Sequence, residues 1–190
     1  MPLDDFSRVL DAARTGAEWA VAELYRDLSG PVLRYLTSQV PGEGEDLASE
    51  TWIDVARGLR RFRGEEQDFR RYVFAIARRR LVDYRRKTLR RRTHAAPVEI
   101  IEQYLPTGNV EAEAMEAFST RQAMALLGRL PPAQAEVVLL RVVGGFSAKE
   151  VAGLIGKREG AVRVLQHRAL ARLAEELGRE GVTPERLRAM

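Results

Sequence analysis

The sequence predicts an all-α protein made of two helical domains joined by a flexible linker, with a helix-turn-helix in the second domain. Apolar residues recur at helical spacing up to about residue 92, and again from about residue 111 to residue 177. Between these stretches, Pro97, Pro106, Gly108 and Asn109 interrupt a segment without sustained periodicity, which is typical of a linker. No segment alternates apolar and polar residues between turn signals, as a β-hairpin would.

These observations divide the chain into a first domain over residues 1–92, an acidic linker over residues 93–119 and a second domain over residues 120–190. The charges follow the same division. Nine of the fifteen residues from Arg78 to Arg92 are Arg or Lys, opposed by Asp83 alone, whereas five Glu and no cation lie between Glu99 and Glu116. A basic block followed by an acidic one indicates that the two segments have different roles.

The composition excludes several kinds of protein. The 190 residues carry a net charge of +4 and include no Cys, which rules out disulfides and thiolate metal sites and is compatible with a reducing cytoplasm. The sequence contains no run of about 18 apolar residues, which is the length needed to span a membrane. Residues 1–6 lack the basic and apolar regions of a signal peptide. We therefore expect a cytoplasmic protein without membrane insertion, cofactor or bound metal.

A helix-turn-helix is predicted over residues 146–173. Ser147 and Glu150 form a capping box, so a helix should begin near Ala148. Ala152, Gly156 and the later Val162 supply a small residue at the helix crossing, a turn residue and an apolar residue that fixes the second helix. An ordinary helical hairpin is the alternative, but the ordered set favours DNA binding.

The second helix of this motif has an apolar stripe, Val162, Leu165, Ala169 and Leu173, that should face the core. The opposite side should enter the major groove of DNA, where Arg can bind guanine and Val164 can contact a thymine methyl. Arg168 is equally suited to a phosphate, and His167 to plain solvent exposure. The predicted DNA contacts, including one in the turn, are Arg158, Arg163, Val164, His167 and Arg168.

A basic helix is predicted from Phe69 to about Lys87. Its apolar face includes Val73 and Ala77, and Arg residues spaced by seven lie opposite. Cations interleaved with aromatic rings suit single-stranded nucleic acid, because cations follow phosphates and rings stack on bases. A solvated basic face over a core helix is the alternative. The predicted nucleic-acid contacts are Arg71, Tyr72, Phe74, Arg78, Arg79 and Arg85.

An acidic helix is predicted from Asp46 to Leu59. Leu47, Ala48, Thr51, Trp52, Val55 and Leu59 should face inward. An Ile among polar residues on the outer face can bind a protein partner, although a single exposed Ile is also ordinary. The residues expected to face outward are Asp46, Ser49, Glu50, Ile53 and Arg57. The predicted partner contacts among them are Asp46, Ser49, Glu50 and Ile53.

Three stretches, in this order, resemble the extracytoplasmic-function branch of the bacterial sigma-70 family. Glu45-Asp-Leu-Ala-Ser-Glu-Thr-Trp52 resembles the family's helix that docks on RNA polymerase. Phe62-Arg-Gly64 with residues 69–83 resembles the segment that melts and recognises the minus-ten promoter element. Residues 130–173 resemble the domain that binds the minus-thirty-five element. The chain departs from the family at Ser49, Tyr72 and Arg79, where Gln, Trp and Asn are usual.

The resemblance implies a sigma factor, which is not an enzyme. Such a protein binds core RNA polymerase, through the clamp of the β′ subunit and the flap of the β subunit, and then recognises and opens promoter DNA. An anti-sigma factor is left open as a further partner. In the family, the loop before the basic helix holds a base flipped out of the melted strand. Here that loop is Gly64, Glu65, Glu66, Gln67 and Asp68.

Two other classes of function are alternatives for this sequence. A dimeric helix-turn-helix regulator would bind duplex DNA without polymerase, but it would leave the basic helix of the first domain without a role. A nuclease could hold a metal with Glu65, Glu66 and Asp68. No paired-acid or His-rich constellation and no phosphate-binding Gly loop in the sequence supports such an enzyme.

Overall fold

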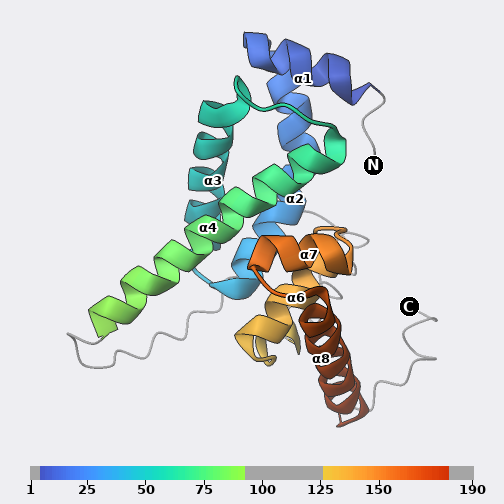
Figure 1. The fold of residues 1–190 in the computed structure, drawn as a ribbon. Coiled ribbons are helices and arrows are strands. Elements are labelled where there is room, and N and C mark those ends of the chain that lie inside the picture. Colours follow the sequence, from blue (N-terminus) through green and yellow to red (C-terminus); the bar gives the residue numbers. More distant parts are fainter. Residues whose placement is uncertain (1–4, 93–125, 180–190) are drawn as a thin grey trace, which may run out of the picture. The chain divides into compact units, whose positions relative to one another are not determined.

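The computed structural model describes residues 5–92 and 126–179. The chain divides into two compact units, Met1–Tyr104 and Leu105–Met190. The described parts of both units form helices and no strand, which confirms the predicted all-α, two-domain fold (Figure 1). The predicted linker, 93–119, lies outside the described residues, so its bounds remain a prediction. Among the helices that are described, none is both long and apolar enough to cross a lipid bilayer.

The first unit contains α1 (Phe6–Thr15), α2 (Glu18–Gln39), α3 (Gly44–Leu59) and α4 (Glu66–Arg92). α4 packs against both α2 and α3, and α1 packs against α2 (Figure 1). Large side chains from α2 and α4 fill the core, which fixes the orientation of the outer faces of these helices. These fully buried side chains are Leu28, Val32, Tyr35, Leu36, Phe69, Val73, Phe74 and Leu81.

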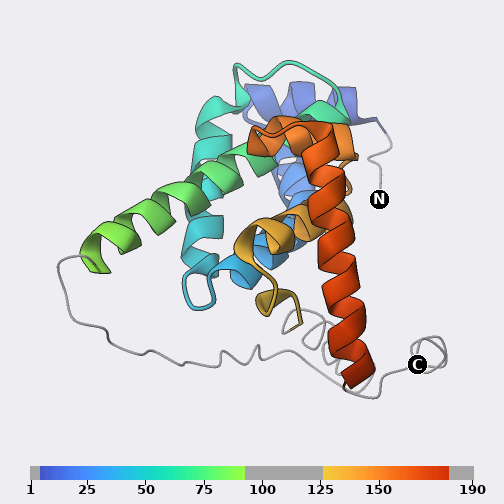
Figure 2. The same ribbon diagram turned by 60° about the horizontal axis from the view of Figure 1, so that its bottom comes forward.

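The second unit contains α6 (Pro132–Val142), α7 (Ala148–Ile155) and α8 (Glu159–Arg179). α6 and α7 pack against α8, which continues beyond them (Figure 2). One core cluster joins Leu130, Ala135 and Val138 to Ala169 of α8, with the half-buried Leu127 and Leu173 packed against it. The apolar stripe predicted for the second helix therefore faces the core at Ala169 and Leu173.

The connection between α7 and α8 forms the predicted helix-turn-helix. The Ser147 hydroxyl accepts from the backbone N–H of Glu150 at 3.2 Å, and the Glu150 carboxylate accepts from the backbone N–H of Ser147 at 2.8 Å. Gly156 ends α7 with a φ of +66°, a conformation that only glycine adopts without strain. These two local devices set where α7 starts and stops, as the sequence predicted.

Candidate polymerase and nucleic-acid interfaces

The predicted docking face of α3 is exposed. Asp46, Ser49 and Ile53 all face solvent, and the Ile53 side chain is 51% exposed. On the opposite side, Val55 is buried, and the buried Thr51 hydroxyl donates to a backbone carbonyl one turn earlier at 2.7 Å. The helix therefore presents a large apolar side chain among polar ones, which suits a protein partner.

A groove between α2 and α3 adjoins this face. Its volume is about 430 Å³, and Ser49 lies on its wall. The rings of Tyr25 and Trp52 meet at one side of it, with centroids 4.9 Å apart. Trp52 is half-buried, so the inward orientation predicted for it is only partly correct. Tyr25 and Leu33 of α2 also line this groove and are 50% and 37% exposed, and no motif in the sequence had indicated them.

The apolar face of α4 is wider than the helical spacing predicted. Val73 and Ala77 are fully buried, as expected. Phe74 is fully buried as well, and its ring packs on Tyr35 of α2 with centroids 5.7 Å apart. This corrects the prediction that Phe74 faces nucleic acid. The physical reason is that α4 is covered by α2 and α3 together, so a second arc of the helix is removed from solvent.

The three Arg residues spaced by seven along α4 are all half-buried. Arg71 pairs with Asp68 one turn earlier at 3.2 Å. Arg85 donates a hydrogen bond to the side-chain oxygen of Gln39 on α2. These guanidinium groups are held partly against the protein surface, and their predicted phosphate contacts remain a proposal.

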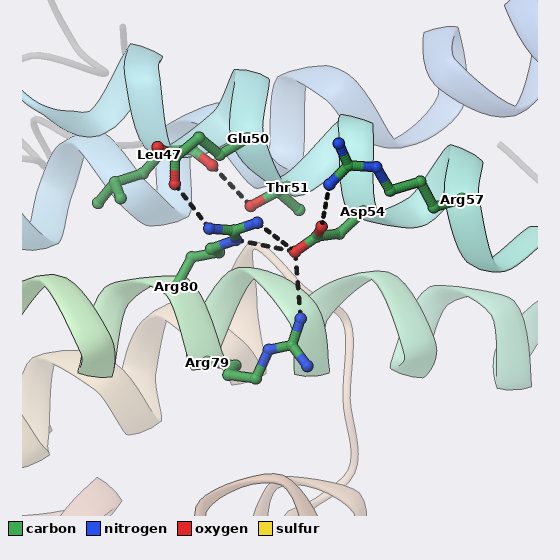
Figure 3. Close-up of polar contacts among 7 residues, drawn as sticks. All are labelled: Leu47, Glu50, Thr51, Asp54, Arg57, Arg79 and Arg80. Atoms are coloured by element: carbon green, nitrogen blue, oxygen red, sulfur yellow. Dashed lines mark hydrogen bonds and ion pairs between the residues drawn. The ribbon is translucent and has the colours of Figure 1, made fainter.

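Arg79 and Arg80 both reach across from α4 to Asp54 on α3 (Figure 3). Arg80 donates from Nε and Nη2 to Oδ2 of Asp54 at 2.8 and 2.5 Å, and Arg79 donates from Nη2 to the same oxygen at 3.1 Å. The third nitrogen of Arg80, Nη1, pairs with Glu50 at 3.0 Å. Glu50, predicted as a polymerase contact, thus also has a partner on α4. The sequence analysis missed Asp54 and Arg80, since only tertiary packing brings them together.

The charge state of Asp54 follows from this arrangement. Burial alone would raise the pKa of its carboxyl, but the hydrogen bonds and positive charges of Arg80, and then of Arg79, hold that pKa below its ordinary value. The Asp54 side chain is only 12% exposed. Asp54 is therefore ionised at neutral pH, at the contact between the docking helix, α3, and the basic helix, α4.

Tyr72 is half-buried beside this carboxylate. Its ring packs between Phe62 and Phe69, with centroid distances of 5.2 and 6.3 Å. Burial raises the pKa of the Tyr72 hydroxyl, and the charge of Asp54 adds to that shift while Arg79 opposes it. The phenol remains a neutral donor, and its ring is held at the edge of the aromatic cluster.

The predicted flipped-base loop is shorter than expected, because α4 begins at Glu66 and includes its last three residues. Asp68 accepts from the backbone N–H of Glu65 at 3.1 Å, so it caps the helix start. A shallow cavity of about 660 Å³ lies beside this segment. Residues of α1 line it together with the loop: Phe6, Ser7, Gly64, Glu65, Glu66 and Gln67. The sequence of the loop does not indicate that residues of α1 line this cavity as well.

The outer side of α8 presents its predicted DNA contacts. Arg163, His167 and Arg168 are exposed, and Val164 is 49% exposed; Arg158 is exposed in the turn. Arg163 pairs with Glu159 one turn earlier at 2.6 Å.

The inner side of α8 is tied to α6. Arg141, which the sequence analysis did not single out, donates to Gln166 at 3.3 Å and to the backbone carbonyl of Phe146. It thereby connects α6 to the start of the helix-turn-helix. No group of three or more side chains that could hold a metal occurs among residues 5–92 and 126–179.

Comparison with known proteins identifies both units. Residues 20–92 match the family model for sigma-70 region 2, and residues 120–173 match that for sigma-70 region 4. The chain is 33% identical over 175 residues to the ECF RNA polymerase sigma factor SigD of Mycobacterium tuberculosis, covering 89% of this chain and 82% of SigD. It is 34% identical over 183 residues to the ECF RNA polymerase sigma factor ShbA of Streptomyces griseus, covering 90% and 96%.

Two solved structures share the fold. CnrH, in complex with the cytosolic domain of CnrY, superposes with a TM-score of 0.62 at 21% identity, covering 92% of this chain and 98% of CnrH. RpoE of Bartonella quintana, in complex with the anti-sigma factor NepR, gives a TM-score of 0.62 at 22% identity, covering 82% and 97%. With two matched regions in order and relatives aligned over most of their length, the chain belongs to the extracytoplasmic-function sigma factors of bacterial RNA polymerase.

Proposed function

We propose that this sigma factor divides its work between three surfaces of the described residues. The outer face of α3 binds core polymerase through Asp46, Ser49, Glu50 and Ile53. The outer side of α4 and the loop before it bind and open the minus-ten element. The outer side of α8 binds the minus-thirty-five element. The observation that carries this assignment is that the described residues of the first unit expose Ile53 on one helix and cations on the next.

On this proposal the protein acts on DNA by binding alone. The nucleotidyl transfer belongs to polymerase, so the sigma factor needs no catalytic residue of its own. The compartment is the cytoplasm, because the chromosome and core polymerase are there.

An anti-sigma factor is a further proposed partner. CnrH and RpoE of Bartonella quintana were both solved with a bound protein, and the latter is described as an anti-sigma factor. A protein that covered Ile53 and the α4 cations together would block docking and DNA binding at once.

Run-off transcription tests the proposal. Core polymerase is mixed with this protein and a library of genomic fragments, and the start sites are mapped. We expect discrete start sites that require the protein and that share upstream elements. If the protein instead binds duplex fragments tightly without polymerase and directs no initiation, it is a helix-turn-helix regulator of another kind.

A further inference from the structure

Asp54 connects the docking helix to the basic helix through a single oxygen. Three N–H groups of Arg79 and Arg80 converge on its Oδ2, at 2.5 to 3.1 Å (Figure 3). Its other oxygen, Oδ1, faces Arg57 of its own helix at 3.5 Å. Only 12% of the Asp54 side chain is exposed. Its bonds to Arg80 are therefore shielded more than an ordinary surface ion pair, whereas its bond to Arg79 is exposed.

The two Arg residues are held in different ways. Arg80 is 29% exposed, and carboxylates engage all three of its guanidinium nitrogens: Asp54 takes two and Glu50 takes one. Arg79 gives one N–H to Asp54 while 64% of its side chain is exposed. Arg80 is therefore a structural cation between α3 and α4. Arg79 is held through one nitrogen of its guanidinium, and most of its side chain is exposed to solvent.

We propose that Asp54 is a positioning residue for promoter DNA: it holds the Arg79 guanidinium ready for a backbone phosphate of the melted minus-ten strand. This inference rests on the proposed role of α4. A free Arg loses rotamer freedom when it binds a phosphate. Asp54 removes part of that cost in advance, because the side chain is already ordered before DNA arrives. Its planar fork can bond a carboxylate and a phosphate at the same time.

The direction in which Asp54→Asn changes the affinity for DNA distinguishes a positioning role of Asp54 from a simple effect of its charge. Removing a negative charge near bound DNA should strengthen binding, because the repulsion between carboxylate and phosphate is lost. Asp54→Asn removes the charge, and it also weakens the hold on Arg79. If positioning dominates, this variant binds DNA more weakly than the native protein does.

The experiment measures binding of a fluorescent single strand by the full-length protein assembled with core polymerase. The probe is the non-template minus-ten strand of a promoter that the run-off experiment has mapped. Asp83→Asn is the matched control, because Asp83 is also an acid of the first unit and its pair with Arg86, at 3.9 Å, is exposed. We expect Asp54→Asn to weaken binding roughly two- to tenfold, the range set by immobilising one flexible side chain. We expect Asp83→Asn to leave binding unchanged or slightly tighter.

A double-mutant cycle with Arg79→Gln isolates the positioning effect. In the native background this substitution should weaken strand binding, and in the Asp54→Asn background it should weaken binding by a clearly smaller factor. Equal factors in both backgrounds, or tighter binding by Asp54→Asn, would overturn the inference and leave the proposed function intact. If the native holoenzyme does not bind the strand at all, the proposed function itself fails, and the inference with it.

Circular dichroism and affinity for core polymerase check that Asp54→Asn folds. Should it not, Arg79→Lys carries the test, because the substitution keeps the charge at an exposed position but lacks the fork. We expect Arg79→Lys to bind the strand more weakly than the native protein. Equal affinity would show that a held guanidinium is not needed.

Discussion

The hydroxyl of Tyr72 on α4 occupies the space that a methyl group on Gly58 of α3 would fill. Cζ of Tyr72, the ring carbon that bears the hydroxyl, would lie 3.1 Å from that methyl carbon. Gly58 is thus required for the approach of a ring that the proposed function places at the minus-ten element. A side chain at this position forces the Tyr72 hydroxyl to shift, and with it the ring that packs on Phe62 and Phe69.

Gly58→Ala should therefore impair promoter opening more than stability. Alanine gains about 1 kcal/mol of helix propensity, which offsets part of an overpacking cost of about 1–3 kcal/mol. Tyr72 must still move. We expect an altered near-ultraviolet tyrosine signal and slower opening of a mapped promoter, followed by permanganate reactivity. Adding Tyr72→Phe should restore much of the opening rate, since it removes the overlapping hydroxyl. Failure of this rescue would mean that the close approach has no role.

Phe74→Ala should lower the free energy of unfolding by about 3–5 kcal/mol, because the ring is fully buried against Tyr35. Urea denaturation monitored by circular dichroism measures the loss. The control is Leu89→Ala on the same helix, whose side chain is 67% exposed; it should change stability by less than about 0.5 kcal/mol. A stable Phe74→Ala variant with a selective defect in DNA binding would restore the stacking role that burial argues against.

Ile53→Asp should weaken the binding of core polymerase by about 2 kcal/mol, the scale of an interface hot spot. The fold should be intact, because the side chain is half exposed. Fluorescence titration of labelled protein with core measures the affinity. Leu170→Asp is the control, since Leu170 is likewise 51% exposed but lies on α8, outside the predicted face. Unchanged affinity of the Ile53 variant, with normal circular dichroism, would remove this face from the assignment.

Arg163→Ala should change which upstream element is preferred, by about 1–3 kcal/mol for a bidentate base contact. Selection of minus-thirty-five elements from a randomised promoter library, with holoenzyme, measures the preference. Arg172→Ala removes the same charge from an exposed position farther along α8 and should leave the preference unchanged. A uniform loss across all sequences would instead make Arg163 a phosphate contact.

Local sequence signals were sufficient where structure depends on neighbours along the chain. The capping box at Ser147 and the left-handed turn at Gly156 place α7 without help from the rest of the fold. Helical spacing likewise predicted that Ile53 of α3 and Arg163 of α8 would face solvent, because one buried stripe determines the opposite side of a helix.

The sequence by itself thus determined the fold class, the helix-turn-helix and the family. Tertiary structure alone decided which of the polar and aromatic residues have partners on another helix. Phe74 is buried because α4 is covered by two helices, α2 and α3, rather than by one. The spacing of apolar residues along α4 does not indicate that a second helix covers it. Asp54 meets Arg80 across 26 positions of the chain, where only the packing of α3 on α4 sets the distance. Helical periodicity describes one helix at a time, whereas these contacts depend on how two helices cross.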